Sequence, residues 1–189
     1  MGEHDIPYCR HSLGEAEVEA VTEVLRSGWI ARGPKSRDFE QAISTHVQAP
    51  HAVSCANGSV ALEIALRGLG IGPGDDVIVP TLTWVASAMA ILKVGARPVF
   101  ADVDPVTHCL STTTVADAWT SQCRGVLAVD MGGIPHDATG LRALVDARGA
   151  VLVQDAAHSL GGRFEDGLPV GGGDRAHATT FSFHPAKTI

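Results

Sequence analysis

The chain has 189 residues, of which 45% are hydrophobic and 19% charged, and its formal net charge is -7. Charges of both signs are interspersed, which disfavours nucleic-acid binding, and the apolar runs are shorter than the ~18–20 residues that a membrane span needs. The four cysteines stand far apart without a C-x-x-C pair, so we expect one domain, or most of one, in the cytoplasm.

Residues 1–50 are predicted to form a helical segment that carries a loop. Residues 15–27 have apolar side chains at helical spacing, acidic residues early and Arg26 late, an arrangement that the helix dipole favours. The glycine- and proline-containing segment 28–35 predicts a loop, and a second helix is expected over about residues 38–47.

Residues 51–189 alternate short apolar runs with longer helical patterns. Strands are expected at 52–54, 77–79, 98–101, 125–129, 150–153 and 179–183, helices at about 60–69, 85–94 and 138–148, and a reversal at Asp166-Gly167. This alternation predicts an α/β fold with a mostly parallel sheet covered by helices. In such a sheet, ligands bind beyond the carboxyl ends of the strands.

Asn57-Gly58-Ser59 follows the first of these strands and opens a helix. Free backbone N–H groups, a hydroxyl and the helix dipole would together favour a phosphate at this point. The alternative is an ordinary helix cap by Asn57 or Ser59 with no ligand.

Asp155 and Lys187 are the two reactive candidates. Asp155 ends an apolar run, where an unpaired carboxylate is costly, so it needs a partner such as a protonated cofactor ring nitrogen. The alternative is an N-cap of a helix that begins at Ala156. Lys187 lies in a stretch nearly free of charge, where a lysine can react with an aldehyde, although a lone lysine is more often a surface residue.

The remaining candidates are aromatic and imidazole side chains. Trp84 could offer its face to a planar ring or fill core volume, and His158 and His184 are ambiguous as single residues. The histidines and cysteines lack metal-ligand spacing, so no metal site is expected. A phosphate cradle, an aromatic face, a buried acid and a lysine on successive strand ends together meet the requirements for holding pyridoxal phosphate.

Several segments resemble the DegT/StrS family of nucleotide-sugar aminotransferases, and the resemblance runs from Ile6 to Ile189. The segments that carry it are Gly28–Lys35, Leu69–Asp75, Val79–Val85, Ala101–Pro105, Gln154–Gly161 and Phe181–Lys187. The last two are the most specific. The resemblance implies the large domain of an aspartate-aminotransferase-like, pyridoxal-phosphate-dependent transferase.

The same resemblance assigns roles to individual residues. Lys187 would hold the cofactor covalently and move protons, Asp155 would pair with the pyridine nitrogen, Trp84 would stack on the ring, and His158 would approach the phenolic oxygen. Residues implied at the phosphate are Asn57, Gly58, Ser59 and Ser182, and those implied beside the sugar are Trp29, Ile30, Ala31 and His184.

The chain also departs from the family pattern. Asp130 stands where relatives usually have His, and Ala31-Arg32 replaces a frequent Thr in the substrate loop. Relatives continue for about as much chain again after the lysine. We therefore expect residues 51–189 to be an incomplete cofactor-binding domain, with a C-terminal domain absent.

The resemblance implies transamination of a nucleotide-linked keto-sugar, with glutamate as the expected amino donor, by a homodimer. Some segments are similar to enzymes that make UDP-4-amino-4-deoxy-L-arabinose for lipopolysaccharide, and others to enzymes that make UDP-4-amino-4,6-dideoxy-N-acetyl-altrosamine. The alternatives are a non-catalytic cofactor-binding domain or dimer partner, and a sugar dehydratase of the same fold. Such dehydratases have His in place of the lysine, which Lys187 disfavours.

Overall fold

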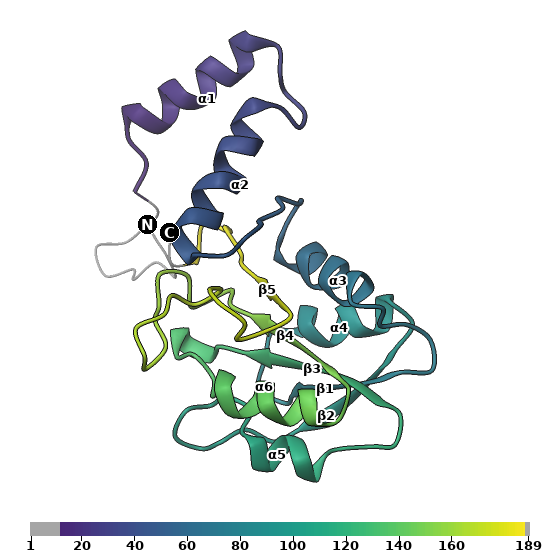
Figure 1. Cartoon of the computed structure of the whole chain (residues 1–189). Helices are drawn as coiled ribbons and strands as arrows, with labels where there is room; N and C mark the ends of the chain where they lie inside the picture. Colours follow the sequence, from purple (N-terminus) through teal and green to yellow (C-terminus); the bar gives the residue numbers. More distant parts are fainter. Residues whose placement is uncertain (1–11, 188–189) are drawn as a thin grey trace, which may run out of the picture.

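A computed structural model describes residues 12–187, so Ile6, Cys9 and Ile189 lie outside the described residues. Its centre is a five-stranded sheet in the order β2-β1-β3-β4-β5, in which every neighbouring pair is parallel (Figure 1). The strands are β1 (Asp76–Pro80), β2 (Arg97–Ala101), β3 (Cys123–Val129), β4 (Val151–Asp155) and β5 (Ala178–Thr180). The carboxyl ends of all five strands therefore lie along one edge of the sheet.

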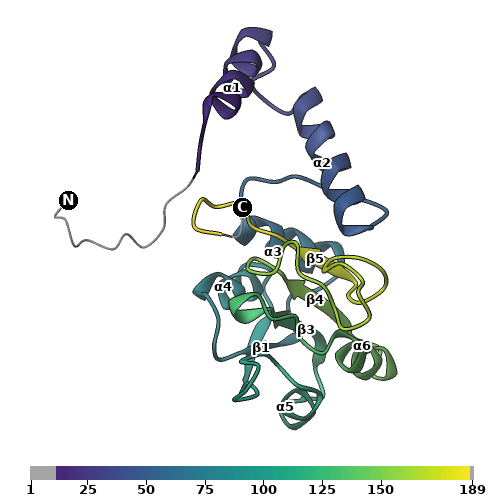
Figure 2. The same cartoon turned by 90° about the vertical axis from the view of Figure 1, so that its left-hand side faces the viewer.

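Helices cover both faces of this sheet (Figures 1 and 2). On one face lie α3 (Gly58–Gly68) and α4 (Val85–Lys93), and on the other lie α5 (Thr112–Asp117) and α6 (Ala138–Ala147). Alternate residues of β1 point to opposite faces, so Val77 and Val79 pack with α3 and α4 while Ile78 packs with α5 and α6. The predicted parallel, doubly covered α/β fold is confirmed.

Two further helices stand apart from the sheet, with α1 beyond α2 (Figure 2). They are α1 (Glu15–Ser27), which has no buried residue, and α2 (Pro34–Val47), in which only Val47 is buried. Gly28 ends α1 with a φ of 76°, and α2 begins earlier than expected because proline suits the first turn of a helix. The division into residues 1–50 and 51–189 stays a prediction.

Residues 52–54 are not a strand, contrary to our expectation. They run in extended form between α2 and α3, with no strand partner among residues 12–187. The backbone N–H and the hydroxyl of Ser54 both donate to Glu40 of α2 at 2.8 Å. An apolar run becomes a strand only where a neighbouring strand lies beside it, and here a side chain takes that role.

One strand boundary and one helix also differ from expectation, while one turn is confirmed. β5 ends at Thr180 rather than at residue 183, because its partner β4 ends at Asp155 in the same register. Helix α5, which Ser111 and Thr114 begin with a capping box, was not predicted. The reversal at Asp166-Gly167 is confirmed, with Gly167 at a φ of 83°. No helix in the described part of the chain could cross a membrane.

Candidate active site

Asp155 lies at the carboxyl end of strand β4 and is only 7% exposed. Its Oδ2 accepts a hydrogen bond from Ser87 Oγ at 3.1 Å, and its Oδ1 accepts one from the Ala157 N–H at 3.2 Å. Burial raises the pKa of Asp155 above its ordinary value. No helix begins at Ala156, so the helix-cap alternative is wrong, although Asp155 does cap a turn. A buried carboxylate whose partners in the described chain are neutral suits a cationic ligand.

Lys187 lies opposite His158, with its Nζ 2.9 Å from His158 Nε2. Burial lowers the pKa of His158, and the charge of Lys187 lowers it further. A neutral imidazole can accept a hydrogen bond from the lysine through Nε2, which places its own proton on Nδ1. The structure thus brings together two residues that are 29 positions apart in the sequence.

Gly58 and Ser182 also meet in the structure. A Cβ atom at Gly58 would lie 3.1 Å from Ser182 Cβ, so the start of α3 packs directly against the segment that leads to Lys187. Asn57 caps α3 by accepting the Val60 N–H at 2.9 Å. The cap leaves the first backbone N–H groups of the helix, at Gly58 and Ser59, available to an anion, with the Ser182 hydroxyl beside them.

Trp84 and residues 29–31, which are also expected site residues, are exposed. Trp84 precedes α4 and is 73% exposed, so it does not fill core volume. Trp29, Ile30 and Ala31 are exposed in the connection between α1 and α2, which Figure 1 shows at the far end of α2 from β5. Their substrate role stays a prediction.

His184 is exposed and organises the turn that carries Lys187. Its Nδ1 accepts the Ala186 N–H at 3.1 Å, and its carbonyl accepts the Lys187 N–H at 2.8 Å. The preceding residue, Phe183, packs edge-to-face on Phe39 of α2, with ring centroids 4.9 Å apart. The lysine is therefore held by its own turn and by an aromatic contact to a helix.

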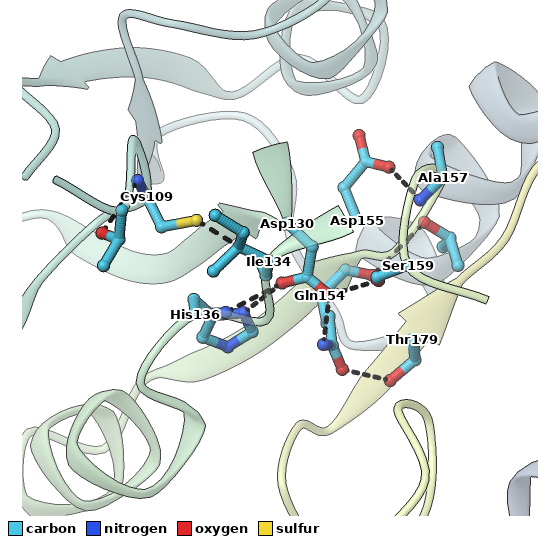
Figure 3. A network of polar contacts seen from close by, with 11 residues as sticks. Cys109, Asp130, Ile134, His136, Gln154, Asp155, Ala157, Ser159 and Thr179 are labelled. Atoms are coloured by element: carbon cyan, nitrogen blue, oxygen red, sulfur yellow. Dashed lines mark hydrogen bonds and ion pairs between the residues drawn. The ribbon is translucent and has the colours of Figure 1, made fainter. Parts of the chain in front are cut away.

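Two groups of functional residues were missed by sequence reasoning. Ser87 is buried and orients Asp155, and Thr83 Oγ1 lies 2.7 Å from Ser87 Oγ. Because the Ser87 proton goes to Asp155, Thr83 is the donor to Ser87. The second group is a buried hydrogen-bond network around Asp130, which lies next to Asp155 (Figure 3). Neither group has a local sequence signal that includes its carboxylate, since Asp155 is 68 positions from Ser87 and Asp130 is 29 positions from Ser159.

A cavity of about 580 Å³ opens between α2, α3 and β5. The extended residues 51–55 form one wall, and residues 177–184 form another. Gly58 and Ser182 border this cavity, whereas Asp155 and Lys187 do not line it. The cavity thus adjoins Gly58 and Ser182, which were predicted at the phosphate, but it does not reach Asp155 or Lys187.

These residues fit pyridoxal phosphate. The free N–H groups of α3 suit its phosphate, and buried Asp155 suits its protonated ring nitrogen. Lys187 offers an amine for its aldehyde, next to an imidazole that can take up a proton. Each polar group of the cofactor therefore has a residue of matching chemistry in the chain.

Gly58→Ala should weaken pyridoxal phosphate binding by about tenfold, because the new methyl group displaces Ser182 beside the phosphate. Because the neighbour that must move is the half-buried side chain of a serine rather than backbone of the core, the folded state should survive the substitution. The matched control is Gly68→Ala in the same helix, where a Cβ meets nothing within 4 Å. Absorbance titration with pyridoxal phosphate measures the affinity of each variant, and equal affinities of the two variants would contradict the placement of the phosphate.

Comparison with known proteins agrees with this chemistry. Residues 11–189 match the DegT/DnrJ/EryC1/StrS aminotransferase family. The structure is similar to that of a protein from Streptococcus pneumoniae described as a sugar aminotransferase, which has been solved in PLP and PMP forms, with 35% identity and a TM-score of 0.91. That similarity covers 97% of this chain and 50% of the S. pneumoniae chain in its PMP form.

Two further structures are similar. DesV from S. venezuelae shares 37% identity, with a TM-score of 0.83, over 92% of this chain and 47% of its own. A 3-amino-5-hydroxybenzoic acid synthase shares 33% identity, with a TM-score of 0.86, over 95% of this chain and 47% of its own. The chain thus spans about half the length of the structures it matches.

The family match and the site agree on the cofactor and on the kind of chemistry. Aminotransferases of this family use pyridoxal phosphate, and the chain carries the lysine, the buried acid and the helix N-terminus that the cofactor requires. The chain belongs to the DegT/DnrJ/EryC1/StrS aminotransferase family.

Proposed function

We propose that the protein transfers an amino group from an amino acid, glutamate, to the ketone of a nucleotide-linked sugar such as a UDP-4-keto-hexose. The observation that carries this proposal is the contact of Lys187 with His158, whose pKa is lowered by burial, next to a buried carboxylate that lacks a cationic partner in the described chain. Similar structures that are described as sugar aminotransferases support the sugar as acceptor.

Lys187 is proposed to move the proton in each half of the transfer. Pyridoxal phosphate, when bound, supplies an aldehyde for amine exchange and a ring that accepts the electron pair of the substrate carbon. The amine of Lys187 would take a proton from that carbon and deliver it to the cofactor carbon that had carried the aldehyde oxygen, which is general acid–base catalysis. His158 accepts a hydrogen bond from the amine and so holds Nζ in a defined position.

Asp155 is proposed to keep the cofactor ring nitrogen protonated. Its low exposure excludes water, so the charge of its carboxylate acts strongly on a nearby cation. The hydrogen bonds from Ser87 and from the Ala157 N–H fix the carboxylate in orientation. The start of α3 and Ser182 would hold the phosphate, while Trp84 would stack on the ring.

Borohydride reduction tests the anchor residue. The 189 residues contain three lysines, Lys35, Lys93 and Lys187, so peptide mapping gives an unambiguous answer within this chain. We expect the visible absorption of the protein to be bleached and the label to be found on Lys187. A label on Lys35 or Lys93, or no labelled lysine at all, would contradict the proposal.

A screen of ketone acceptors tests the substrate. UDP- and dTDP-linked keto-sugars are offered with glutamate, together with a cyclic ketone that is not a sugar, because one similar structure is an aminohydroxybenzoate synthase. Formation of 2-oxoglutarate with only the nucleotide-linked sugars supports the proposal. Turnover with the cyclic ketone alone would contradict the proposal and indicate an acceptor that is not a sugar.

Assembly and pathway complete the proposal. Val18, Val21 and Leu25 of α1 are all more than half exposed, and a second subunit in a homodimer would cover such a stripe. A cytoplasmic enzyme of this kind would supply amino sugars for a cell-surface polysaccharide or another modified sugar. The non-catalytic alternative, a cofactor-binding domain, predicts labelling of Lys187 without formation of 2-oxoglutarate, and the dehydratase alternative predicts loss of water from the sugar without its amination.

A further inference from the structure

Asp130 lies directly after β3 and its side chain is completely buried. Oδ1 accepts hydrogen bonds from the backbone N–H of His136 at 3.2 Å and from its ring Nδ1 at 2.7 Å. Oδ2 accepts from Gln154 Nε2 at 2.8 Å and from Ser159 Oγ at 2.5 Å. Four donors and no acceptor surround the side chain, which is the environment of a charged carboxylate with all its acceptor sites used.

The donors come from two segments that Asp130 joins, as Figure 3 shows. Gln154 and Ser159 flank Asp155 and His158 along the chain, whereas His136 belongs to the loop between β3 and α6. The backbone adds two contacts between the same segments. The Asp130 N–H donates to the Asp155 carbonyl at 3.1 Å, and a Cβ at Gly133 would lie 3.0 Å from the His158 carbonyl oxygen.

Gln154 extends the network to the next strand. Its Oε1 accepts a hydrogen bond from Thr179 Oγ1 of β5 at 3.1 Å, which also fixes the amide orientation so that Nε2 faces Asp130. The segment that bears Asp155 and His158 is thus tied on one side to the end of β3 and on the other to β5. A buried network in which each hydrogen bond supports the next rigidifies the backbone that carries it.

We propose that Asp130 is a positioning residue whose carboxylate holds residues 154–159 so that Asp155 faces the cofactor ring and His158 faces Lys187. The proposal rests on the proposed function, which assigns roles to those two side chains. Asp130 itself touches neither the cofactor nor the substrate in this scheme. Its effect is carried by Gln154 and Ser159.

The charge of Asp130 acts in addition to its hydrogen bonds. Burial is the main cause of the raised pKa of Asp155, and the charge of Asp130 raises it further. Burial lowers the pKa of His158 overall, and the charge of Asp130 opposes that effect. The other charged groups that act on His158 are Lys187, which lowers its pKa, and Asp155, which raises it. A loosened segment would expose His158 and separate it from Lys187, and both changes would raise the pKa of His158 towards its ordinary value.

Ser159→Ala is the variant that tests the proposal. It removes one hydrogen bond to Asp130 and leaves the carboxylate with three donors, so the fold should survive. The matched control is Thr120→Val, because Thr120 Oγ1 donates to the buried carboxylate of Asp76 at 2.5 Å. Asp76 lies at the amino end of β1, at the opposite edge of the sheet from the site. Each variant removes one hydrogen bond from a hydroxyl to a buried carboxylate.

In the full-length protein, Ser159→Ala should raise the dissociation constant of pyridoxal phosphate by about tenfold, which is the loss of one charge-assisted hydrogen bond. In the cofactor-free protein, proton NMR should show the His158 titration midpoint move upwards. Thr120→Val should change neither quantity. If both variants change both quantities equally, or if Ser159→Ala changes neither, Asp130 has only a structural role and the proposal is overturned.

Asp130→Asn gives a second test, since it keeps the side-chain volume and removes the charge. His136 Nε2 is buried with no partner in the described chain, so Asp130 is the only polar contact of that ring. Where Asp130→Asn folds, it should weaken cofactor binding more than Ser159→Ala does, and unchanged binding would overturn the proposal. The NMR readout does not depend on turnover. The two proposals can therefore fail separately. If the proposed function is wrong, the Lys187 and Asp155 variants keep the parent rate of amino transfer, while Ser159→Ala still shifts the titration midpoint of His158.

Discussion

Lys187→Ala is expected to lower the rate of amino transfer by about 10⁴-fold, the upper end of what general acid–base catalysis contributes. The variant loses the amine that moves the proton and also the amine that anchors the cofactor. Rapid mixing of the cofactor-loaded protein with glutamate, followed by absorbance, measures the rate of the first half of the reaction. A rate within tenfold of the parent would remove Lys187 from the mechanism.

Two controls accompany this variant: one tests whether the effect is specific to Lys187, and the other separates its anchoring role from its proton-transfer role. Lys35→Ala removes a lysine whose side chain is 64% exposed on α2, and it should leave the rate unchanged. Methylamine added to Lys187→Ala supplies a proton carrier that is not attached to the chain, so it should restore part of the rate. Failure of rescue in a variant that binds the cofactor as tightly as the parent would show that Lys187 is an anchor only.

Asp155→Asn is expected to lower the rate of the chemical step by about 10²-fold or more, each tenfold being about 1.4 kcal/mol of transition-state stabilisation. Asparagine keeps the shape and one acceptor oxygen, but it loses the charge that keeps the cofactor ring nitrogen protonated. Single-turnover transfer from glutamate, in a variant shown to be folded and cofactor-loaded, measures the loss. Transfer at the parent rate would limit Asp155 to its turn-capping contact with Ala157.

The same substitution should have the opposite effect on stability. Because burial raises the pKa of Asp155, its ionisation destabilises the cofactor-free fold once the pH exceeds the ordinary pKa of an aspartate, and the penalty is fully developed above the raised pKa. Asparagine carries no such penalty. At pH 7 the cofactor-free variant should therefore melt at a temperature equal to or higher than the parent, and the difference should shrink as the pH falls and the parent's carboxyl group takes up its proton. A lower melting temperature at pH 7 would mean that the hydrogen bonds of Asp155 outweigh its burial.

The fold class could be predicted from the sequence because it depends on patterns between near neighbours. Alternating apolar runs and helical spacing identified α1, α4 and α6 with boundaries close to those observed. Errors occurred where a distant partner decides the outcome. Residues 52–54 have a strand-like pattern but lie against Glu40, and β5 ends early because β4 ends beside it.

The candidate site divides in the same way. Asp155 and Lys187 could be named from the sequence, because Asp155 ends a strand, Lys187 comes after one, and a parallel sheet brings all strand ends to one edge. The start of α3 was named from a strand at residues 52–54 that the structure does not contain. The helix-cap alternative for Asp155 could be rejected only from the structure, which shows a turn where a helix was considered. Trp84 was left open between core and site, and its exposure excludes the core.

Most of the secondary-structure elements, though not α5, and the reactive side chains at strand ends could thus be predicted from the sequence, since periodicity and strand-end position are local properties. The contacts that orient those side chains required the tertiary structure. Ser87 reaches Asp155 across 68 positions, and Ser159 reaches Asp130 across 29. No local pattern indicates such pairs, because a buried carboxylate is satisfied by whichever donors the packing of strands and loops places around it.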